Sequence, residues 1–185
     1  MKLKPVIKHI LENARHYEWS LQGFGMLRLY LDKETRLHVW SWSHAVPDVS
    51  EIHDHPWDFS STIVAGVLRN HRFLRAKNDG GYYLTQKILC GPNGCAMGDV
   101  QEVRLLKCPG ELYGEGDEYL QRANEIHRSA PDDGTVTIVT RRFLPDPDHA
   151  NVFWEPGQQW VSAEPRRATP EEVKDITSRA LARWF

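Results

Sequence analysis

Two histidines one residue apart, His53 and His55 in the stretch SEIHDHPWDF, have the type and spacing to hold a metal ion. Side chains alternate between the two faces of an extended chain, so both imidazoles point the same way if this stretch is a strand. Trp57 and Phe59 then share the face of the histidines, whereas the two aspartates of the stretch lie on the other face. We therefore expect a metal site inside a pocket walled by aromatic rings, without the aspartates as ligands.

A third histidine, His127, lies in the later stretch GEGDEYLQRANEIHRSAP and is the candidate third ligand. Three imidazoles leave open positions on a metal, which a substrate together with dioxygen or water could fill. Imidazole suits iron, zinc, copper and nickel alike, so the ligand set by itself does not choose among these metals.

Arginines supply fixed positive charge near the same segments. Arg28, Arg141 and Arg142 are candidates because a guanidinium is the natural bidentate partner of a carboxylate. Strand alternation sends one of Arg141 and Arg142 into the pocket and the other outward. His71, in VLRNHRF, is a further candidate for the pocket, whereas we interpret His38 as a packing residue. These arginines predict an anionic small-molecule substrate. Arg28 could equally belong to a surface ion pair.

The segments that must position these residues are mostly short strands. Aromatic and β-branched runs bounded by Gly, Pro, Asn or Asp are typical of strands, and they are MLRLYLD, TRLHVWSWS, STIVAG, VLRNHRFL, GYYLTQKIL, VQEVRLL, DEYLQ and TVTIVTRRF. Strands without intervening helices predict an antiparallel sandwich or barrel. Apolar residues at helical spacing predict a helix from Pro5 to about Tyr17, and Thr169 with Pro170 predicts the start of a C-terminal helix.

Composition limits the classes of partner. The 185 residues fit one domain, and 41% hydrophobic with 26% charged residues is ordinary for a globular chain. A formal net charge of −2 shows no basic excess for nucleic acid or an anionic membrane, and no apolar run approaches the ~20 residues of a spanning helix. We expect a cytoplasmic protein, in which the odd set Cys90, Cys95 and Cys108 are reduced thiols.

The histidine segments resemble the two motifs of the cupin superfamily. His53 and His55 form the His-x-His of the first motif and Gly66 its glycine, while the motif's glutamate falls at Phe59 or Ser60. The resemblance implies an all-β double-stranded β-helix, or jelly-roll, barrel in a single domain: a helical segment over 1–20, the barrel over 21–160, and a tail and helix over 161–185. Cupins are often dimers, so a homodimer is an expectation as well.

A narrower resemblance is to the cysteine dioxygenase (thiol dioxygenase) family. It lies in IHDH, in YLQRANEIHR and in the upstream RLYLD. It implies that His53, His55 and His127 hold a non-haem ferrous ion, with zinc or nickel as alternatives, and that Arg28 grips a substrate carboxylate. Tyr119, eight residues before the last histidine, is a catalytic candidate.

The chain departs from that family after the last ligand. Thr140 and Arg142 stand where the family carries a histidine and a tyrosine. If Arg142 matches that tyrosine it points inward, which makes it a second catalytic candidate, and the substrate would contact Arg28, Trp57, Phe59 and His71.

Three functions therefore stay open from the sequence. One is a metal-dependent oxygenase of small anionic substrates, thiols among them. The second is a non-catalytic metal- or ligand-binding cupin that acts as a sensor or storage module. The third is a metal-independent sugar-nucleotide epimerase in which a histidine acts as the base.

Overall fold

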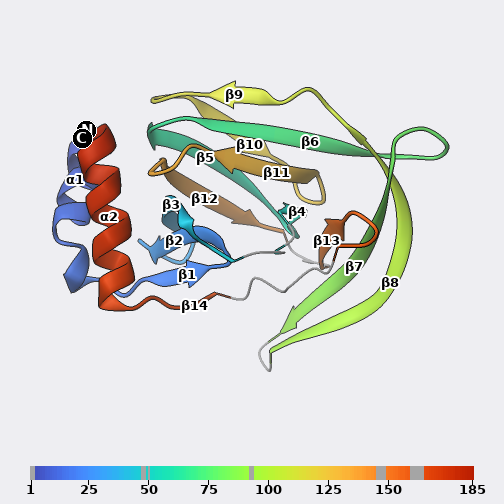
Figure 1. The fold of residues 1–185 in the computed structure, drawn as a ribbon, viewed down its shortest axis with the longest axis horizontal. Coiled ribbons are helices and arrows are strands. Elements are labelled where there is room, and N and C mark those ends of the chain that lie inside the picture. The colour runs from blue at the N-terminus through green and yellow to red at the C-terminus, as the bar shows by residue number, and fades with distance from the viewer. Residues whose placement is uncertain (1–2, 47–48, 50, 92–93, 145–148, 159–164) are drawn as a thin grey trace.

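Two antiparallel β-sheets, with one helix near each end of the chain, make up the computed structural model of the protein (Figure 1). It describes residues 3–46, 49, 51–91, 94–144, 149–158 and 165–185. The predicted all-β class is confirmed at this level, as is a helix at each end.

The first sheet, here called the helix-side sheet, contains the strands that carry Arg28 and Tyr119. In spatial order its strands are β10 (Glu118–Gln121), β5 (Trp57–Ala65), β12 (Val136–Phe143), β3 (Thr35–Ala45), β2 (Phe24–Tyr30), β1 (Ser20–Gln22) and β14 (Arg166–Arg167). The predicted strands β2 and β3 pair with each other, with Arg28 opposite His38 in the register.

The second sheet, here called the hairpin sheet, is dominated by the long β7–β8 hairpin that curves away from the helices (Figure 1). Its strands in spatial order are β11 (Ile126–Pro131), β4 (Ile52–His53), β13 (Ala150–Trp154), β7 (Gly81–Gly91), β8 (Gly94–Lys107), β6 (Leu68–Ala76) and β9 (Glu111–Tyr113). An additional pairing joins β11 to β6, so His127 lies between β4 and β6.

The helices α1 (Leu3–Glu12) and α2 (Pro170–Trp184) lie side by side, with the two ends of the chain next to each other (Figure 1). The predicted first helix ends at Glu12, and a short 3-10 turn, η1 (Ala14–His16), follows it. Helix α2 begins as predicted, because the Thr169 hydroxyl accepts the Glu172 N–H and the Glu172 carboxylate accepts the Thr169 N–H. Neither described helix has the length and apolar character needed to cross a bilayer.

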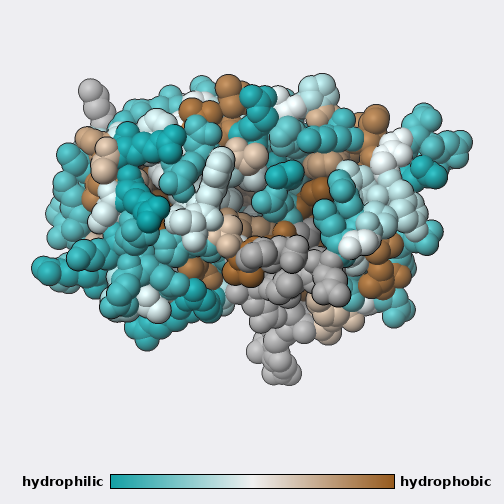
Figure 2. Space-filling model, viewed as in Figure 1, coloured by the Kyte–Doolittle hydropathy of each residue, from teal (hydrophilic) through white to brown (hydrophobic). Residues whose placement is uncertain are grey.

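The main core lies between the helices and one face of the helix-side sheet. Strand alternation divides β2 and β3: Leu27 and Leu37 are completely buried in this core, whereas Arg28 and His38 line a cavity on the opposite face. The outer surface seen in Figure 2 is largely hydrophilic, with apolar side chains in small separate groups.

Two turns hold residues whose backbone lies in the left-handed region, Gly66 and Asn124. Gly66 links β5 to β6 with a φ of 91°, and a Cβ there would lie 2.6 Å from the Thr135 hydroxyl, so the tight reversal requires glycine. Asn124 has a φ of 61°, in the left-handed region that asparagine adopts more readily than most residues.

The stretch SEIHDHPWDF is not one continuous strand, contrary to expectation. It supplies β4 to the hairpin sheet and β5 to the helix-side sheet, and His55 lies in the segment that crosses between them. Cys108 is a free thiol; the side chains of Cys90 and Cys95 lie outside those that the structure describes.

Candidate metal centre

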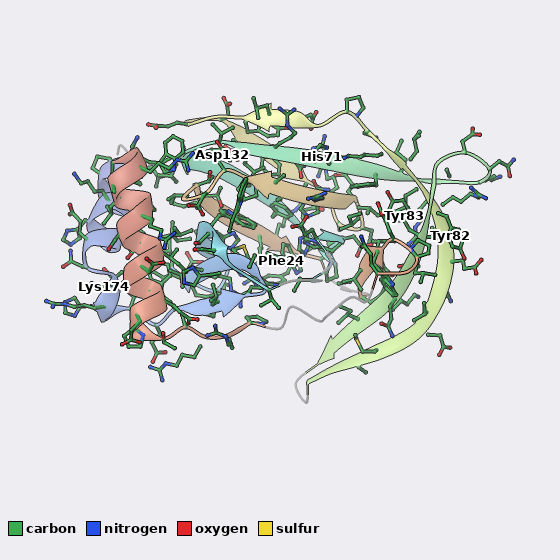
Figure 3. The ribbon with its side chains drawn as sticks, viewed as in Figure 1. Phe24, His71, Tyr82, Tyr83, Asp132 and Lys174 are labelled. Atoms are coloured by element: carbon green, nitrogen blue, oxygen red, sulfur yellow. The ribbon has the colours of Figure 1, made fainter. Side chains whose placement is uncertain are left out.

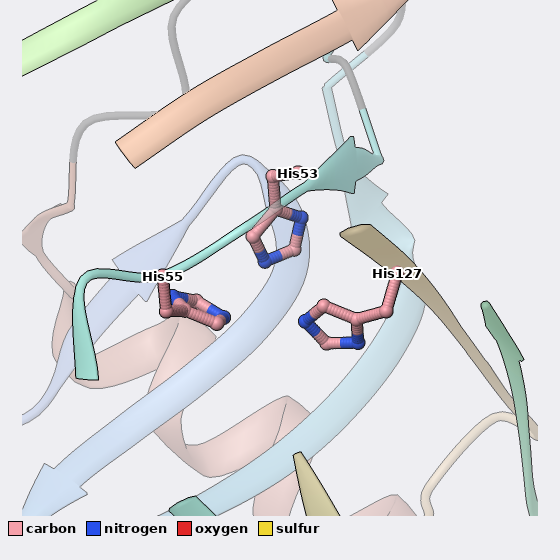
Figure 4. A group of neighbouring side chains, drawn as sticks. All are labelled: His53, His55 and His127. Carbon is pink, nitrogen blue, oxygen red and sulfur yellow. The ribbon is translucent and has the colours of Figure 1, made fainter. Parts of the chain in front are cut away.

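The imidazoles of His53, His55 and His127 converge on one point, as Figure 4 shows. One potential ligand atom from each ring lies within 4.8 Å of the other two. The ring centroids are 4.7 Å apart for His53 and His55, 4.8 Å for His53 and His127, and 5.3 Å for His55 and His127. His53 and His127 are direct partners in the β4–β11 register, so strand pairing brings them together.

Hydrogen bonds orient two of the three rings. The Nδ1 atom of His53 lies 3.0 Å from the backbone oxygen of Glu51, and Nδ1 of His127 lies 3.1 Å from Oδ1 of Asn70. Both partners are acceptors, which assigns the proton to Nδ1 and leaves Nε2 as the free lone pair. The Nε2 atom of His127 is buried and has no hydrogen-bond partner. An orphaned buried nitrogen that faces two other imidazoles fits a metal ligand.

A buried polar chain continues behind His127. The Asn70 amide donates to Oε1 of Gln121 at 3.2 Å, and the Gln121 amide donates to the backbone oxygen of Glu125 at 3.1 Å. Asn70 and Gln121 are both completely buried. Because the NH2 group of Asn70 donates to Gln121, the Oδ1 atom of Asn70 is the one that faces His127. This contact fixes the imidazole in one orientation.

Burial also sets the charge of the three rings. Loss of solvent lowers the pKa of His53 and lowers the pKa values of His55 and His127 well below the usual range. The mutual proximity of the rings lowers the pKa of His55 and His127 further. All three imidazoles are therefore neutral at pH 7, which is the form that binds a metal.

The aspartates next to these histidines have other partners, as expected. The Asp54 carboxylate accepts the Asn151 backbone N–H at 2.6 Å and the Asn151 side-chain amide at 2.7 Å. The Asp58 carboxylate accepts the Ala123 N–H at 2.8 Å and pairs with Arg142. These contacts tie the crossing segment to β13 and the start of β5 to the turn before β11, and so hold the histidine backbone in place.

A cavity of about 490 Å³ lies between the two sheets and includes the three imidazoles. Its wall is mainly aromatic and apolar, with a few cationic or polar groups. The lining includes Phe24, Met26, Trp40, Trp42, Ile88, Met97, Trp57, Phe59, Tyr119, Arg28, Arg36 and His38.

Besides the three histidines, four of the predicted site residues line this cavity: Arg28, Trp57, Phe59 and Tyr119. The Trp57 indole stacks on His55 with a centroid distance of 4.1 Å, and Phe59 meets the same imidazole edge-on at 5.4 Å. Burial raises the pKa of the Tyr119 phenol, so it stays protonated at neutral pH.

The predicted inward orientation of Arg142 is wrong. Its side chain is 70% exposed and pairs with Asp58, its direct partner in the β12–β5 register. Arg141 lies on the opposite face of β12, which it shares with the cavity-lining Val139, and its guanidinium carbon is 5.5 Å from the centre of the Trp57 ring; Arg141 itself is not among the residues that line the cavity. Thr140 is exposed on the same side of β12 as Arg142.

The prediction that His71 enters the pocket is also wrong. His71 lies on β6 (Figure 3) and is absent from the cavity wall. In the β6–β11 register its partner is Arg128. Its imidazole packs against Gly110, where a Cβ would approach the ring within 2.6 Å. The preceding residue on β6, Asn70, points inward, since its side chain contacts His127.

Sequence reasoning missed Arg36, His38 and Asn70. The signal for the first two was the alternation in RLHVWSW, where Arg36, His38 and Trp40 share one face of β3. Asn70 carried no comparable signal, because its role depends on the β6–β11 pairing.

No protein-family model matches this chain, and no curated protein shows significant similarity to it.

Proposed function

We propose that this protein is a cupin-type metalloenzyme in which His53, His55 and His127 hold one divalent metal. The observation that carries the proposal is the Nε2 atom of His127, buried without a partner and directed at the other two rings. Two antiparallel sheets around a cavity agree with a jelly-roll barrel.

We propose ferrous iron as the metal and an oxygenase reaction on a small anionic substrate, similar to the thiol dioxygenases. Three neutral imidazoles suit Fe(II), and zinc and nickel are the alternatives. When bound, the ion would supply redox chemistry and open coordination positions.

The side chains of the cavity have separate tasks in this proposal. Arg28, buried and hydrogen-bonded through Nε to the Ser20 hydroxyl at 3.2 Å, presents the rest of its guanidinium to an anionic group of the substrate. Trp57 and Phe59 exclude water around His55, which strengthens electrostatic contacts within the site. The protonated Tyr119 phenol is available to donate a hydrogen bond or a proton.

A non-catalytic metal- or ligand-binding cupin is the second candidate, and one observation favours it. Thr140 and Arg142 lie on the outward side of β12, so neither provides an acid or a base to the cavity. Oxygen uptake by iron-loaded protein, with thiols and other small acids as substrates, separates the two candidates.

The decisive experiment is elemental analysis of protein purified without a polyhistidine tag. We expect near-stoichiometric metal in the wild type, loss of that metal in His127→Ala, and retention in His16→Ala, which removes an exposed imidazole. Absence of metal from the wild type after reconstitution with ferrous iron, or its retention in His127→Ala, would contradict the three-histidine centre.

A further inference from the structure

Three arginines gather around the ring of Tyr30, and two of them, Arg28 and Arg36, also line the cavity. The guanidinium carbons of Arg28, Arg36 and Arg141 lie 5.1, 4.8 and 5.6 Å from the centre of one ring, that of Tyr30. Strand pairing explains the convergence, because Tyr30 is opposite Arg36 in the β2–β3 register and Arg141 follows on the adjacent strand β12. Tyr30 is 48% exposed, so the cluster is open to a ligand from solvent.

These arginines have no carboxylate partner within the described part of the chain. The Nε atoms of Arg36 and Arg141 are buried and lack any hydrogen-bond partner. Arg28 and Arg141 are each only 8% exposed. The three positive charges lie around one ring and largely out of water, so they repel one another. Buried donors without partners add a further free-energy cost.

Packing on aromatic rings compensates only part of this cost. A guanidinium over an aromatic face gains about 0.5–2 kcal/mol, and three cations share the Tyr30 ring. The two carboxylates whose charges act on Arg141, those of Asp32 and Glu34, have other partners in the turn between β2 and β3. Asp32 accepts the Glu34 and Thr35 N–H groups, and Glu34 pairs with Lys33.

His38 adds a neutral donor or acceptor to the same wall. It lies opposite Arg28 in the β2–β3 register, is 6% exposed, and lines the cavity. Its Nε2 atom is buried without a hydrogen-bond partner. The cluster therefore combines three cations with buried polar atoms that a ligand could satisfy.

We infer that Arg28, Arg36 and Arg141, together with His38, form an anion-binding site for a tetrahedral dianion, the phosphoryl group of a small phosphate ester. The three guanidiniums gather around one ring, so their positive charges act at one place. They therefore suit a single ligand group with more than one negative charge. A phosphate monoester carries a charge of about −1.5 to −2 and presents three oxygens, which matches several guanidinium forks better than one carboxylate does.

The anion site lies beside the metal centre but is separate from it. Trp57 stacks on His55, and the Arg36 and Arg141 guanidiniums lie over the same indole at 5.5 Å each. A phosphoryl group held there is one aromatic ring away from the imidazoles, so it anchors a ligand beside them. The role of this group as part of the substrate rests on the proposed function, whereas anion binding itself needs no metal.

Calorimetric titration of inorganic phosphate into the full-length protein tests the inference. The protein is used as purified, after treatment with a chelator, and as the His127→Ala variant, so phosphate on a metal is separated from phosphate on arginine. We expect binding in all three samples and a loss of affinity of about 10- to 100-fold in Arg36→Gln, because a charge-assisted donor pair is removed. Arg15→Gln, which removes an exposed arginine beside α1, is the matched control and should bind as wild type.

Three results would overturn the inference: no phosphate binding to the chelated protein, equal affinity in Arg36→Gln and wild type, or tighter binding of acetate or succinate than of phosphate. If Arg36→Gln does not fold by circular dichroism, Arg141→Gln is judged by the same criteria. Phosphate binding by a wild type that takes up no metal after reconstitution with ferrous iron would count against the metal centre alone. Metal binding by a wild type that binds no phosphate would count against the anion site alone.

Discussion

The Nδ1 atom of His127 and the Oδ1 atom of Asn70 lie 3.1 Å apart in the completely buried interior of the β6–β11 pair. The contact joins a candidate ligand to a residue that no metal would touch. Asn70 is therefore a positioning residue: it determines which imidazole nitrogen is free and where the ring points.

Replacement of Asn70 should weaken metal binding through His127. In Asn70→Leu the acceptor is lost, and we expect metal affinity to fall by about 10- to 100-fold. Asn70→Asp keeps an acceptor at the same position and should retain metal, although Gln121 loses its donor. Competition titrations with a chromophoric chelator measure both variants, and equal affinities in wild type and Asn70→Leu would remove the positioning role.

The stability of the metal-free protein should depend on pH through His38. Burial, and then the neighbouring Arg36, Arg28 and Arg141, lower the pKa of His38 well below 6.5. Below pH 6.5 the unfolded chain therefore binds a proton that the folded protein excludes, so stability falls as the pH falls toward the pKa of the folded state.

We expect His38→Gln to reduce this dependence by about 1 kcal/mol between pH 6.5 and 5.5. Urea unfolding at the two pH values in the presence of a chelator measures it, with His16→Gln as the exposed control. If the free energy of unfolding of His38→Gln changed with pH as much as that of the wild type, His38 would not be kept neutral by the fold.

Loss of Arg142 should leave the cavity unaffected. Its exposed side chain pairs with Asp58 on the outer side of β12, and exposed ion pairs contribute at most about 1 kcal/mol. Arg142→Gln should therefore keep both metal content and phosphate affinity, in contrast to Arg141→Gln, which should lose phosphate affinity. Similar losses in the two neighbouring variants would mean that the β12 alternation is assigned incorrectly.

The start of helix α2 should depend on Thr169. Its hydroxyl accepts the Glu172 N–H, and replacement of such a cap by alanine costs about 1 kcal/mol. Thr169→Ala should lower the free energy of unfolding by that amount, whereas Ser178→Ala, at an exposed position within the same helix, should not lower it. Urea denaturation of both variants provides the comparison.

The sequence was sufficient for the strands with strong local patterns and for both helices. The strands β2 and β3 and the cap at Thr169 depend on patterns of neighbouring residues in the chain, and all three are present. The short strands β1, β9, β11, β13 and β14 were missed, because two to six residues carry little periodicity and are extended only through their partners.

The same distinction applies to the site. The spacing of His53 and His55 was sufficient to predict that the two imidazoles meet at one place. The direction of Arg142 and His71 depended instead on register between strands far apart in sequence. One residue of shift reverses the face of a strand, and a family correspondence at Arg142 gave the wrong face.

The crossing segment between β4 and β5 allows an ion at the three-histidine centre to link distant parts of the chain. His55 lies where the chain leaves the hairpin sheet for the helix-side sheet, and His127 lies on β11 beyond six further strands. An ion shared by these residues would close a loop of roughly 70 residues, and closing a long loop restricts the unfolded chain. Such an ion would be a removable cross-link, and the resistance of this protein to proteolysis would then vary with the supply of metal.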